Sequence, residues 1–552
     1  MVGSGKALLY REPQPDLLFS NLELYNPFTC SWEQTSFSVN EGKIQNIGGY
    51  QGKREFDLLG ARVVPGLIDA HVHIESSLLT PTEFGRMVLS HGTTTVIADP
   101  HEIANVLGSE GILYMLEEGK NTPLDIYVML PSCVPASPDD VGGAALSAQD
   151  LSNFLCQEKV LGLGEVMDVA AVISNNPDMQ EKLDLTTLID GHAPFLGGAV
   201  LDAYIRSGIE SDHECTNLEE AREKMRKGMF IMIREGSTEQ NLRTLIPLVR
   251  PCSLSRCCFA TDDRHAGMLA REGHIDDCIR KAMDEGTELE TALRLATLSP
   301  CERFGIRDRG ALAPGRQADF CILTNDEIFH VKKTFKKGKN INRLRYQEPA
   351  IIRHTFHATL PTEADLAIRR NGIARVIRLE KGQIITRNEE IAVEGERIPD
   401  PEMDLLKVMV CSRYRPGSFA LGIVRGFGFQ EGAIASSVAH DSHNVVAAGA
   451  DDHSLRKAAG IVISRNGGMV VVSHHGISSL PLDCAGLMSS QPYPKVVRAL
   501  QHLDDQTNRM GAIEQPFMYL SFLTLTVVPA LRLTERGLYD VYEQTRVPLF
   551  SG

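Results

Sequence analysis

The stretch that decides the fold is Val63-Val64-Pro65-Gly66-Leu67-Ile68-Asp69-Ala70-His71-Val72-His73-Ile74-Glu75. An apolar run turns at Pro-Gly, resumes, and ends in two histidines one residue apart. Side chains at positions i and i+2 of a strand point to the same side. His71 and His73 can therefore direct two imidazoles, the commonest protein ligands of metals, at one point. A strand that merely contains two histidines fits this stretch equally well, so further ligands are sought downstream.

Short apolar runs alternate with segments of helical periodicity between residues 61 and 305. This alternation and its length predict a parallel sheet closed as a (β/α)8 barrel. Active-site residues of that fold lie at the C-terminal ends of strands. Polar residues do follow the apolar runs here: His71 and His73, then Asp99 and His101, then Glu165, then Asp262. A doubly wound open sheet would instead place its ligands at one crevice.

The regions on either side of the barrel have a different pattern. Residues 1–60 and 306–350 contain short β-like segments, and we expect them to pair in one small composite β domain. The pattern of residues 351–552, which are dense in glycine, predicts an additional C-terminal α/β domain. The chain is also longer than one hydrophobic core usually supports.

Composition restricts the class of partner. The 552 residues carry a net charge of −15, which disfavours nucleic acid or an anionic membrane and leaves a small neutral substrate compatible. No apolar run approaches the roughly 18 residues that span a bilayer, and residues 1–16 lack the apolar stretch of a secretory signal. The twelve cysteines are scattered without a CxxC motif, as expected for reduced thiols in a cytoplasmic protein.

Four histidines and two acidic residues of the barrel region could form one metal site: His71, His73, Glu165, His192, His213 and Asp262. This ligand set suits a pair of first-row divalent cations. A carboxylate at Glu165 could bridge two metals about 3.5–4 Å apart. The set contains no thiolate, which argues against a structural zinc site.

The sequence resembles the adenine deaminase family of the amidohydrolase superfamily over nearly its whole length. The resemblance is carried by PGLIDAHVHIESS (65–77), HGTTTVIADPHEIANVLG (91–108), GLGEVM (162–167), GHAP (191–194), SDHECT (211–216), MIREGS (232–237), TDDRH (261–265), GFGFQEGAIASSVAHDSHN (426–444) and AGLMS (485–489).

The resemblance implies a role for each candidate ligand: His71 and His73 on strand 1, Glu165 as the bridging ligand on strand 4, His192 on strand 5, His213 on strand 6, and Asp262 on strand 8 as both ligand and proton shuttle. It also implies two divalent metal ions, manganese(II) or iron(II). The nitrogen and oxygen ligands permit either metal, and zinc(II) as well.

The implied reaction converts adenine to hypoxanthine and ammonia, a step of purine salvage or catabolism. A bound metal lowers the pKa of water from about 16 to near 7 and makes hydroxide available for attack on C6. Asp262 would take the water proton and deliver it to the leaving amine. Large barrels of this kind commonly associate, so we expect a homo-oligomer.

Four further residues are candidates for the site. Asp99 and His101 would serve proton transfer or bind a ring nitrogen; the alternative is a hydrogen-bonded loop that braces the site. Glu75 and Ser76 directly follow the two histidines and could contact the purine edge, since a carboxylate accepts from a purine N–H. Glu75 could instead orient a histidine.

His440, Asp441 and His443 form a small cluster in the C-terminal region. Two interpretations stay open: a network at a domain interface, or a contribution to the pocket or to another metal site.

Two other functions compete with adenine deamination. One is another metal-dependent hydrolase of the superfamily, acting on a cyclic amide such as a dihydropyrimidine or hydantoin. The other is a non-catalytic scaffold, and retention of all six candidate ligands argues against it. The carboxylate at Glu165 and the AHDSHN segment (439–444) favour the deaminase.

Overall fold

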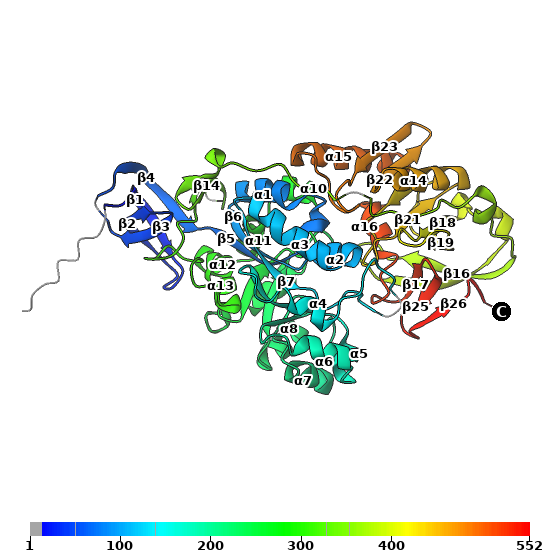
Figure 1. Ribbon diagram of the computed structural model, residues 1–552, viewed down its shortest axis with the longest axis horizontal. Helices are drawn as coiled ribbons and strands as arrows, with labels where there is room; N and C mark the ends of the chain where they lie inside the picture. Colours follow the sequence, from blue (N-terminus) through cyan, green and yellow to red (C-terminus); the bar gives the residue numbers. More distant parts are fainter. Residues whose placement is uncertain (1–13, 50, 138–139, 327, 353, 552) are drawn as a thin grey trace, which may run out of the picture.

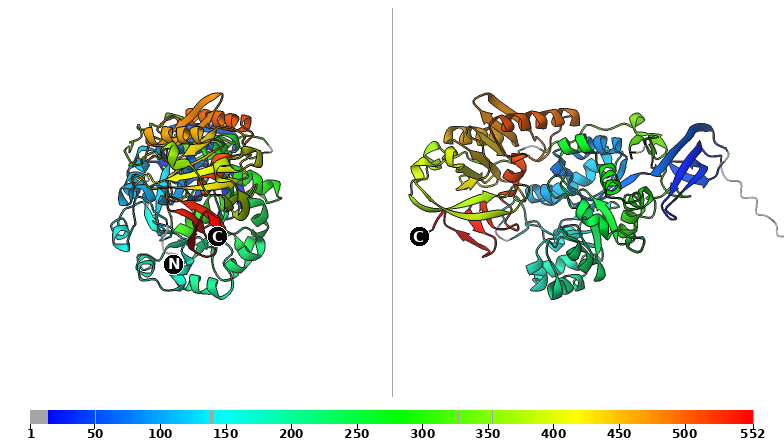
Figure 2. Two further views of the ribbon diagram at one scale, coloured as in Figure 1. Left: turned by 90° about the vertical axis from the view of Figure 1, so that its right-hand side faces the viewer. Right: turned by 180° about the vertical axis from the view of Figure 1, so that it is seen from behind.

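The computed structural model describes residues 14–49, 51–137, 140–326, 328–352 and 354–551. Figure 1 and Figure 2 show the chain extended along one axis, with the first strands at one end and the last third of the chain at the other. The middle of the chain lies between these ends. Among the helices described, none combines the length and apolarity that a membrane crossing requires.

The sheet at the N-terminal end draws on both flanks of the middle region. Its strand order is β15-β14-β13-β4-β1-β2-β3, and β13 pairs antiparallel with β4, Ile322 opposite Val63. The strands are β1 (Leu17–Asn26), β2 (Ser31–Asn40), β3 (Lys43–Ile47), β4 (Arg54–Pro65), β13 (Phe320–Leu323), β14 (Val331–Lys336) and β15 (Lys339–Asn340). Phe19, Phe37 and Phe320 pack together in its buried interior.

The middle of the chain holds eight parallel strands in two sheets, β5-β6-β7-β8-β9 and β10-β11-β12. They are β5 (Leu67–Val72), β6 (Thr93–Ala98), β7 (Asp125–Leu130), β8 (Val160–Val166), β9 (Ile189–Gly191), β10 (Ser211–Asp212), β11 (Phe230–Arg234) and β12 (Cys257–Ala260). Backbone hydrogen bonds join the sheets at both edges: Glu210 N donates to Ile189 O (3.2 Å) and Asp262 N to His71 O (2.9 Å).

Both sheets surround one apolar core. Ile68, Ile97 and Met129 of the first sheet lie in the same buried cluster as Met232 and Cys258 of the second. Helices between the strands cover the outside, so strands such as β5 are buried on both faces, as parallel strands usually are. These helices include α1 (Pro81–Ser90), α2 (His101–Leu107), α3 (Ser109–Glu118), α7 (Gly198–Arg206), α8 (Leu218–Arg226), α10 (Ala266–Glu272) and α11 (Ile275–Asp284).

The last third of the chain forms a mixed sheet in the order β17-β16-β19-β18-β21-β20-β22-β23, with β27 beside β16. Its strands are β16 (Gly372–Leu379), β17 (Thr386–Val393), β18 (Leu406–Cys411), β19 (Phe419–Arg425), β20 (Ala433–Ser436), β21 (Val445–Gly449), β22 (Gly468–Ser473), β23 (Gly476–Pro481) and β27 (Phe550–Ser551). Helix α14 (Asp452–Ser464) packs on β20, β21 and β22.

The strands of this region are mostly antiparallel. Among the described strand pairs of this sheet, only β16 and β19 run in parallel. The hairpin of β22 and β23 shows why, because Ser473 pairs with Gly476 and leaves only a two-residue turn. A parallel pair needs a long crossover, which such a turn cannot provide.

The C-terminal region packs against the middle region near the strand ends. Ser489 N donates to Leu78 O (2.8 Å), and Tyr493 N donates to a carboxylate oxygen of Glu83 (2.9 Å). Helix α15 (Tyr493–Arg509) lies against α1 and α10, and α16 (Pro516–Phe522) lies against β20. One apolar cluster contains Val72 and Val408 and so extends across the contact.

Candidate metal centre

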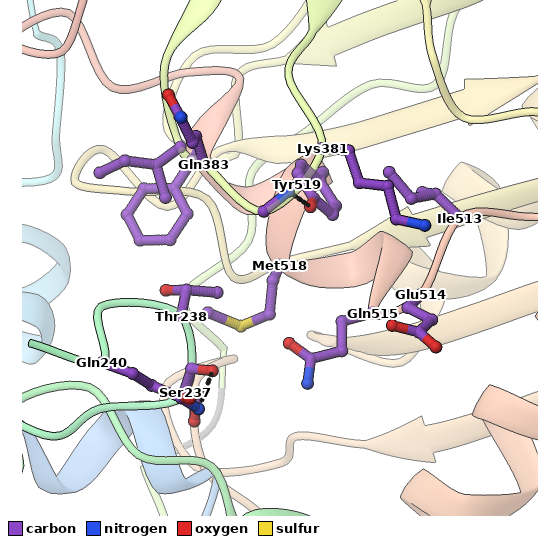
Figure 3. Close-up of a pocket in the computed structure, with 13 residues that line it drawn as sticks. Ser237, Thr238, Gln240, Lys381, Gln383, Ile513, Glu514, Gln515, Met518 and Tyr519 are labelled. Atoms are coloured by element: carbon purple, nitrogen blue, oxygen red, sulfur yellow. Dashed lines mark hydrogen bonds between the residues drawn. The ribbon is translucent and has the colours of Figure 1, made fainter. Parts of the chain in front are cut away.

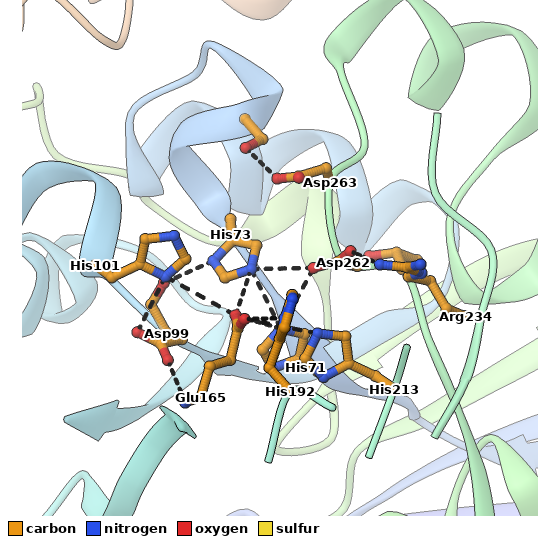
Figure 4. A network of polar contacts seen from close by, with 12 residues as sticks. His71, His73, Asp99, His101, Glu165, His192, His213, Arg234, Asp262 and Asp263 are labelled. Carbon is orange, nitrogen blue, oxygen red and sulfur yellow. Dashed lines mark hydrogen bonds and ion pairs between the residues drawn. The ribbon is translucent and has the colours of Figure 1, made fainter. Parts of the chain in front are cut away.

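Six side chains from five strands meet at the C-terminal ends of the parallel sheets (Figure 4). We call them the Glu165 cluster: His71 in β5 and His73 just after it, Glu165 in β8, His192 after β9, His213 after β10, and Asp262 after β12. The structure thus brings together every residue that the sequence predicted as a metal ligand.

The two carboxylate oxygens of Glu165 face different imidazoles. Oε1 lies 3.1 Å from Nε2 of His71 and 2.9 Å from Nε2 of His73. Oε2 lies 2.8 Å from Nδ1 of His192 and 3.7 Å from Nε2 of His213. A carboxylate placed between two groups of nitrogen ligands is the arrangement that a bridging ligand requires.

Asp262 completes the first of these groups. Its Oδ1 lies 3.3 Å from Nε2 of His71 and 3.0 Å from Nε2 of His73. Ligand atoms of His71, His73, Glu165 and Asp262 all lie within 4.8 Å of one another, and all four residues are buried.

The hydrogen-bond pattern of this group fits a cation. Nδ1 of His73 lies 2.9 Å from the backbone oxygen of Asp99, so in the neutral form of this imidazole, the form that binds a metal, Nδ1 carries the hydrogen and Nε2 presents a lone pair. Yet that Nε2 lies 3.2 Å from Nε2 of His71, and Oε1 of Glu165 has no hydrogen-bond partner. With both imidazoles neutral, lone pairs directed at one another in a buried site are repulsive, and the positive charge of a proton or of a metal ion among them removes the repulsion.

Charges within the cluster shift its pKa values strongly. Burial disfavours the charged form of His71, but Asp262 and Glu165 outweigh burial and raise its pKa to about 10. Burial also opposes ionisation of Glu165, while the charges of His73 and His213 hold its pKa well below the usual range. Both carboxylates are therefore ionised at neutral pH, as metal ligands must be.

The two predicted proton-transfer residues lie beside Glu165. Oδ2 of Asp99 accepts a hydrogen bond from the backbone N–H of Glu165 (3.0 Å). Nδ1 of His101 lies 3.6 Å from Oδ1 of Asp99 and 3.8 Å from Oε1 of Glu165. Both residues are buried, so their polar atoms face the cluster and not solvent.

Glu75 and Ser76 lie on the short helix η1 (Ile74–Ser77) next to the cluster. Ser76 donates to a carboxylate oxygen of Asp263. Oε1 of Glu75 accepts from Ile103 N (3.2 Å), whereas its Oε2 is buried without a partner. Burial raises the pKa of Glu75 to about 7.

Sequence reasoning missed Arg234, the last residue of β11. Nη1 of Arg234 donates to Oδ2 of Asp262 (2.9 Å), and the same guanidinium pairs with Glu214. The signal was available, because Arg234 also ends an apolar strand. It was overlooked because only imidazoles and acids were counted as ligands.

Sequence reasoning also missed Glu102, the second residue of α2. Its carboxylate accepts from Nδ1 of His440 (2.8 Å) and Nε2 of His443, which belong to the C-terminal region. Burial disfavours the charged forms, but the carboxylate raises the pKa of His440 to about 9. Asp441 is buried nearby, within 4.8 Å of ligand atoms of Glu102 and His101.

A cavity of about 360 Å³ lies between the middle and C-terminal regions (Figure 3). Ser237 lies on its wall and accepts a hydrogen bond from His265 N, next to the loop that carries Asp262. Phe522 lines it too and stacks on His440 at 4.6 Å between ring centroids. The cavity is therefore lined by one residue that contacts the loop after Asp262 and by another that contacts His440.

Comparison with known families gives two matches along the chain. The amidohydrolase family model matches residues 62–341, and the adenine deaminase C-terminal domain model matches residues 383–545. An adenine deaminase of Methanoculleus marisnigri is 58% identical over 93% of this chain and 99% of that protein. One of Methanoregula boonei is 52% identical over 97% of this chain and 96% of that protein. A solved adenine deaminase structure aligns with a TM-score of 0.47 at 17% identity, over 59% of this chain and 99% of that chain.

Proposed function

The chain belongs to the adenine deaminase family of the amidohydrolases, and we propose that it hydrolyses adenine to hypoxanthine and ammonia. The observation that carries this proposal is the identity of 58% along 93% of the chain and 99% of a curated relative. The buried Glu165 cluster supports it independently, because its ligands suit a metal-dependent hydrolase.

The cofactor proposed here is a pair of divalent cations, manganese(II) or iron(II), with zinc(II) also compatible with the ligands. His71, His73 and Asp262 would hold one cation and His192 and His213 the other, with Glu165 between them. When bound, such cations lower the pKa of water from about 16 to near 7.

Asp262 is the residue proposed to move the proton. Its Oδ1 faces the histidines, while its Oδ2 is held by Arg234, so the carboxylate has a fixed orientation. In the proposed reaction it accepts the proton of the attacking water and delivers it to the departing amine of adenine. His101 and Asp99, adjacent to Glu165, would assist proton transfer or bind a ring nitrogen.

Glu75 is proposed to contact the purine edge, because its Oε2 is buried and unpartnered beside the cluster. Ser76 would assist by orienting Asp263 or by contacting the purine itself. A purine N–H facing Oε2 would satisfy it, since a buried acceptor without a donor costs about 1–3 kcal/mol.

At the level of architecture, we propose that the two parallel sheets form one closed (β/α)8 barrel at 61–305. The two joining hydrogen bonds and the shared core support this proposal. We also propose two further domains and a homo-oligomeric state. The domains are the composite β domain (1–60 with 306–350) and the C-terminal domain (351–552).

The test is an assay of the purified, metal-loaded enzyme with adenine. We expect equal amounts of ammonia and hypoxanthine, and poor turnover of adenosine if the pocket closes around the free base. Ring opening of a dihydropyrimidine or hydantoin, with no action on adenine, would support the alternative hydrolase. A folded protein that binds no divalent metal would support the scaffold.

A further inference from the structure

Glu102 joins the two halves of the molecule at the edge of the site. It lies on α2 of the middle region, whereas His440 and His443 follow β20 of the C-terminal region. The exposed fractions of Glu102, His440 and His443 are 2%, 5% and 1%, so water cannot replace these contacts. We call these three residues the Glu102 cluster.

Hydrogen positions in the Glu102 cluster differ from those around Glu165. Nδ1 of His443 accepts a hydrogen bond from the backbone N–H of Ala439 (3.3 Å). Its Nε2 must therefore carry the hydrogen, and it donates to Oε2 of Glu102. Nδ1 of His440 donates to Oε1. Each carboxylate oxygen thus has a donor, and the group needs no cation to be satisfied.

Glu102 directly follows His101, the imidazole beside the metal centre. Nε2 of His101 lies 3.5 Å from Oε1 of Glu102, and its Nδ1 faces Asp99 and Glu165 on the other side. The His101 ring also packs edge-on with His73, at 4.5 Å between ring centroids, and Asp441 lies within 4.8 Å of one of its nitrogens. Holding the Glu102 carboxylate therefore fixes one end of the His101 ring.

We propose that His440 and His443 are positioning residues of the C-terminal region, which hold Glu102 by two N–H donors and so fix the His101 imidazole against the metal centre. The inference rests on the proposed function and deepens it, because it gives the C-terminal region a part in turnover. Groups that orient the residues around a metal typically change activity 10- to 100-fold when lost, without being in contact with substrate.

The test compares variants that keep the donor with variants that remove it. Asn at 440 places an amide N–H near the position of Nδ1, and Gln at 443 places one near Nε2. We expect His440→Asn and His443→Gln to retain kcat within about threefold, because the donors that satisfy Glu102 remain. His440→Ala and His443→Ala should lower kcat by about 10- to 100-fold.

Two further readouts distinguish a positioning role from a general disturbance of the fold or of substrate binding. KM for adenine should change little in the alanine variants, and metal content should equal that of the wild type. His91→Ala serves as the matched control, because His91 also pairs with a carboxylate, Asp276 (3.4 Å), away from the site. We expect wild-type kcat for this control.

Three results would overturn the proposal. One is wild-type kcat in both folded alanine variants. Another is an equal loss in donor-keeping and donor-lacking variants, which would indicate packing alone. The third is loss of metal from the alanine variants, which would assign the cluster to metal binding. If an alanine variant does not fold, Glu102→Gln replaces it, with the same expected fall in kcat and the same contradicting result.

The outcome with adenine also distinguishes this proposal from the function on which it rests. A wild-type enzyme that releases no ammonia from adenine counts against the function alone. In that case a crystal structure of His443→Ala decides the positioning role. Displacement of the His101 ring from Asp99 would support it, and an unmoved ring would contradict it.

Discussion

Glu165 and Glu102 are both buried carboxylates surrounded by imidazoles, yet the hydrogens of the neutral His73 and His443 rings lie on opposite sides. At Glu165, Nδ1 of His73 donates to a backbone carbonyl, so in the neutral ring the lone pair of Nε2 points at the carboxylate. At Glu102, Nδ1 of His443 accepts a backbone N–H, so an N–H points at the carboxylate. In both histidines, the backbone group bound to Nδ1 decides what Nε2 presents to the carboxylate. A backbone carbonyl leaves a lone pair on Nε2, which suits a cation, and a backbone N–H leaves a hydrogen on Nε2, which satisfies the carboxylate without one.

Two other buried carboxylates extend this comparison. Asp212 is satisfied by a lysine, since Oδ2 lies 3.0 Å from Nζ of Lys224. Among the residues described, the side chains that donate to Asp140 are hydroxyls, chiefly Thr526 at 2.7 Å. One chain thus contains four surroundings for a buried acid: the proposed metal site, imidazole, ammonium and hydroxyl. Each predicts a different response to substitution or pH.

The largest effect is expected at Glu165. Glu165→Gln removes the charge shared by both ligand groups, so metal content should fall and turnover should drop at least about 10³-fold, because the metal supplies several kcal/mol of transition-state stabilisation. Elemental analysis and ammonia release measure both quantities. Glu102→Gln is the matched control and should keep its metal. Full metal occupancy in Glu165→Gln would contradict the proposal that the Glu165 cluster binds metal and the Glu102 cluster does not.

Asp262→Asn tests the proton-transfer role within the Glu165 cluster. We expect a folded enzyme with kcat lowered about 10²- to 10⁴-fold, the usual contribution of general acid–base catalysis. Steady-state kinetics on protein of measured metal content provides the check. Near-normal kcat at full occupancy would remove Asp262 from that role.

Lys224→Met tests the carboxylate that relies on a lysine. The substitution leaves Asp212 buried without its cation, and removing one partner of a buried pair costs about 3–5 kcal/mol. Lys224 also donates to the backbone of Ala193, so the His192 loop should loosen. Urea unfolding measures the loss, with Lys227→Met as a surface control. Equal stability of the two variants would contradict this account.

The last effect is confined to alkaline shifts in pH and concerns Asp140. Burial, reinforced by the charge of Asp441, raises the pKa of Asp140 to about 8. The folded protein therefore holds this proton more tightly than the unfolded chain, and stability falls as pH rises from about 4 to about 8. Asp140→Asn should remove a fall of up to about 1.4 kcal/mol per pH unit. If the curves of stability against pH for the variant and the wild type run parallel, Asp140 does not contribute to the pH dependence.

Much of the site could be predicted because its ligands have short-range signals. His71 and His73 are two residues apart on one strand, and Glu165 and Asp262 come where apolar strands end. The contact of Glu102 with His440 and His443 had no such signal, because more than 300 residues separate them. Only the packing of the C-terminal region against α2 brings them together.

In the fold, too, features with local sequence signals could be predicted and features that depend on distant contacts could not. Alternating strands and helices in the middle region follow from local periodicity, and the structure contains them. The antiparallel pairing of the C-terminal sheet depends on how tight turns such as 473–476 return the chain. The dense glycines of residues 351–552 do not tell hairpins from crossovers.

The most direct measurement is anomalous diffraction from crystals of the protein loaded with manganese(II). The account predicts anomalous peaks on both sides of the Glu165 carboxylate, one bonded to Nε2 of His71 and His73, and none at Glu102. Absence of a peak beside Glu165 from a fully loaded, active preparation, or a peak at Glu102 in its place, would contradict it.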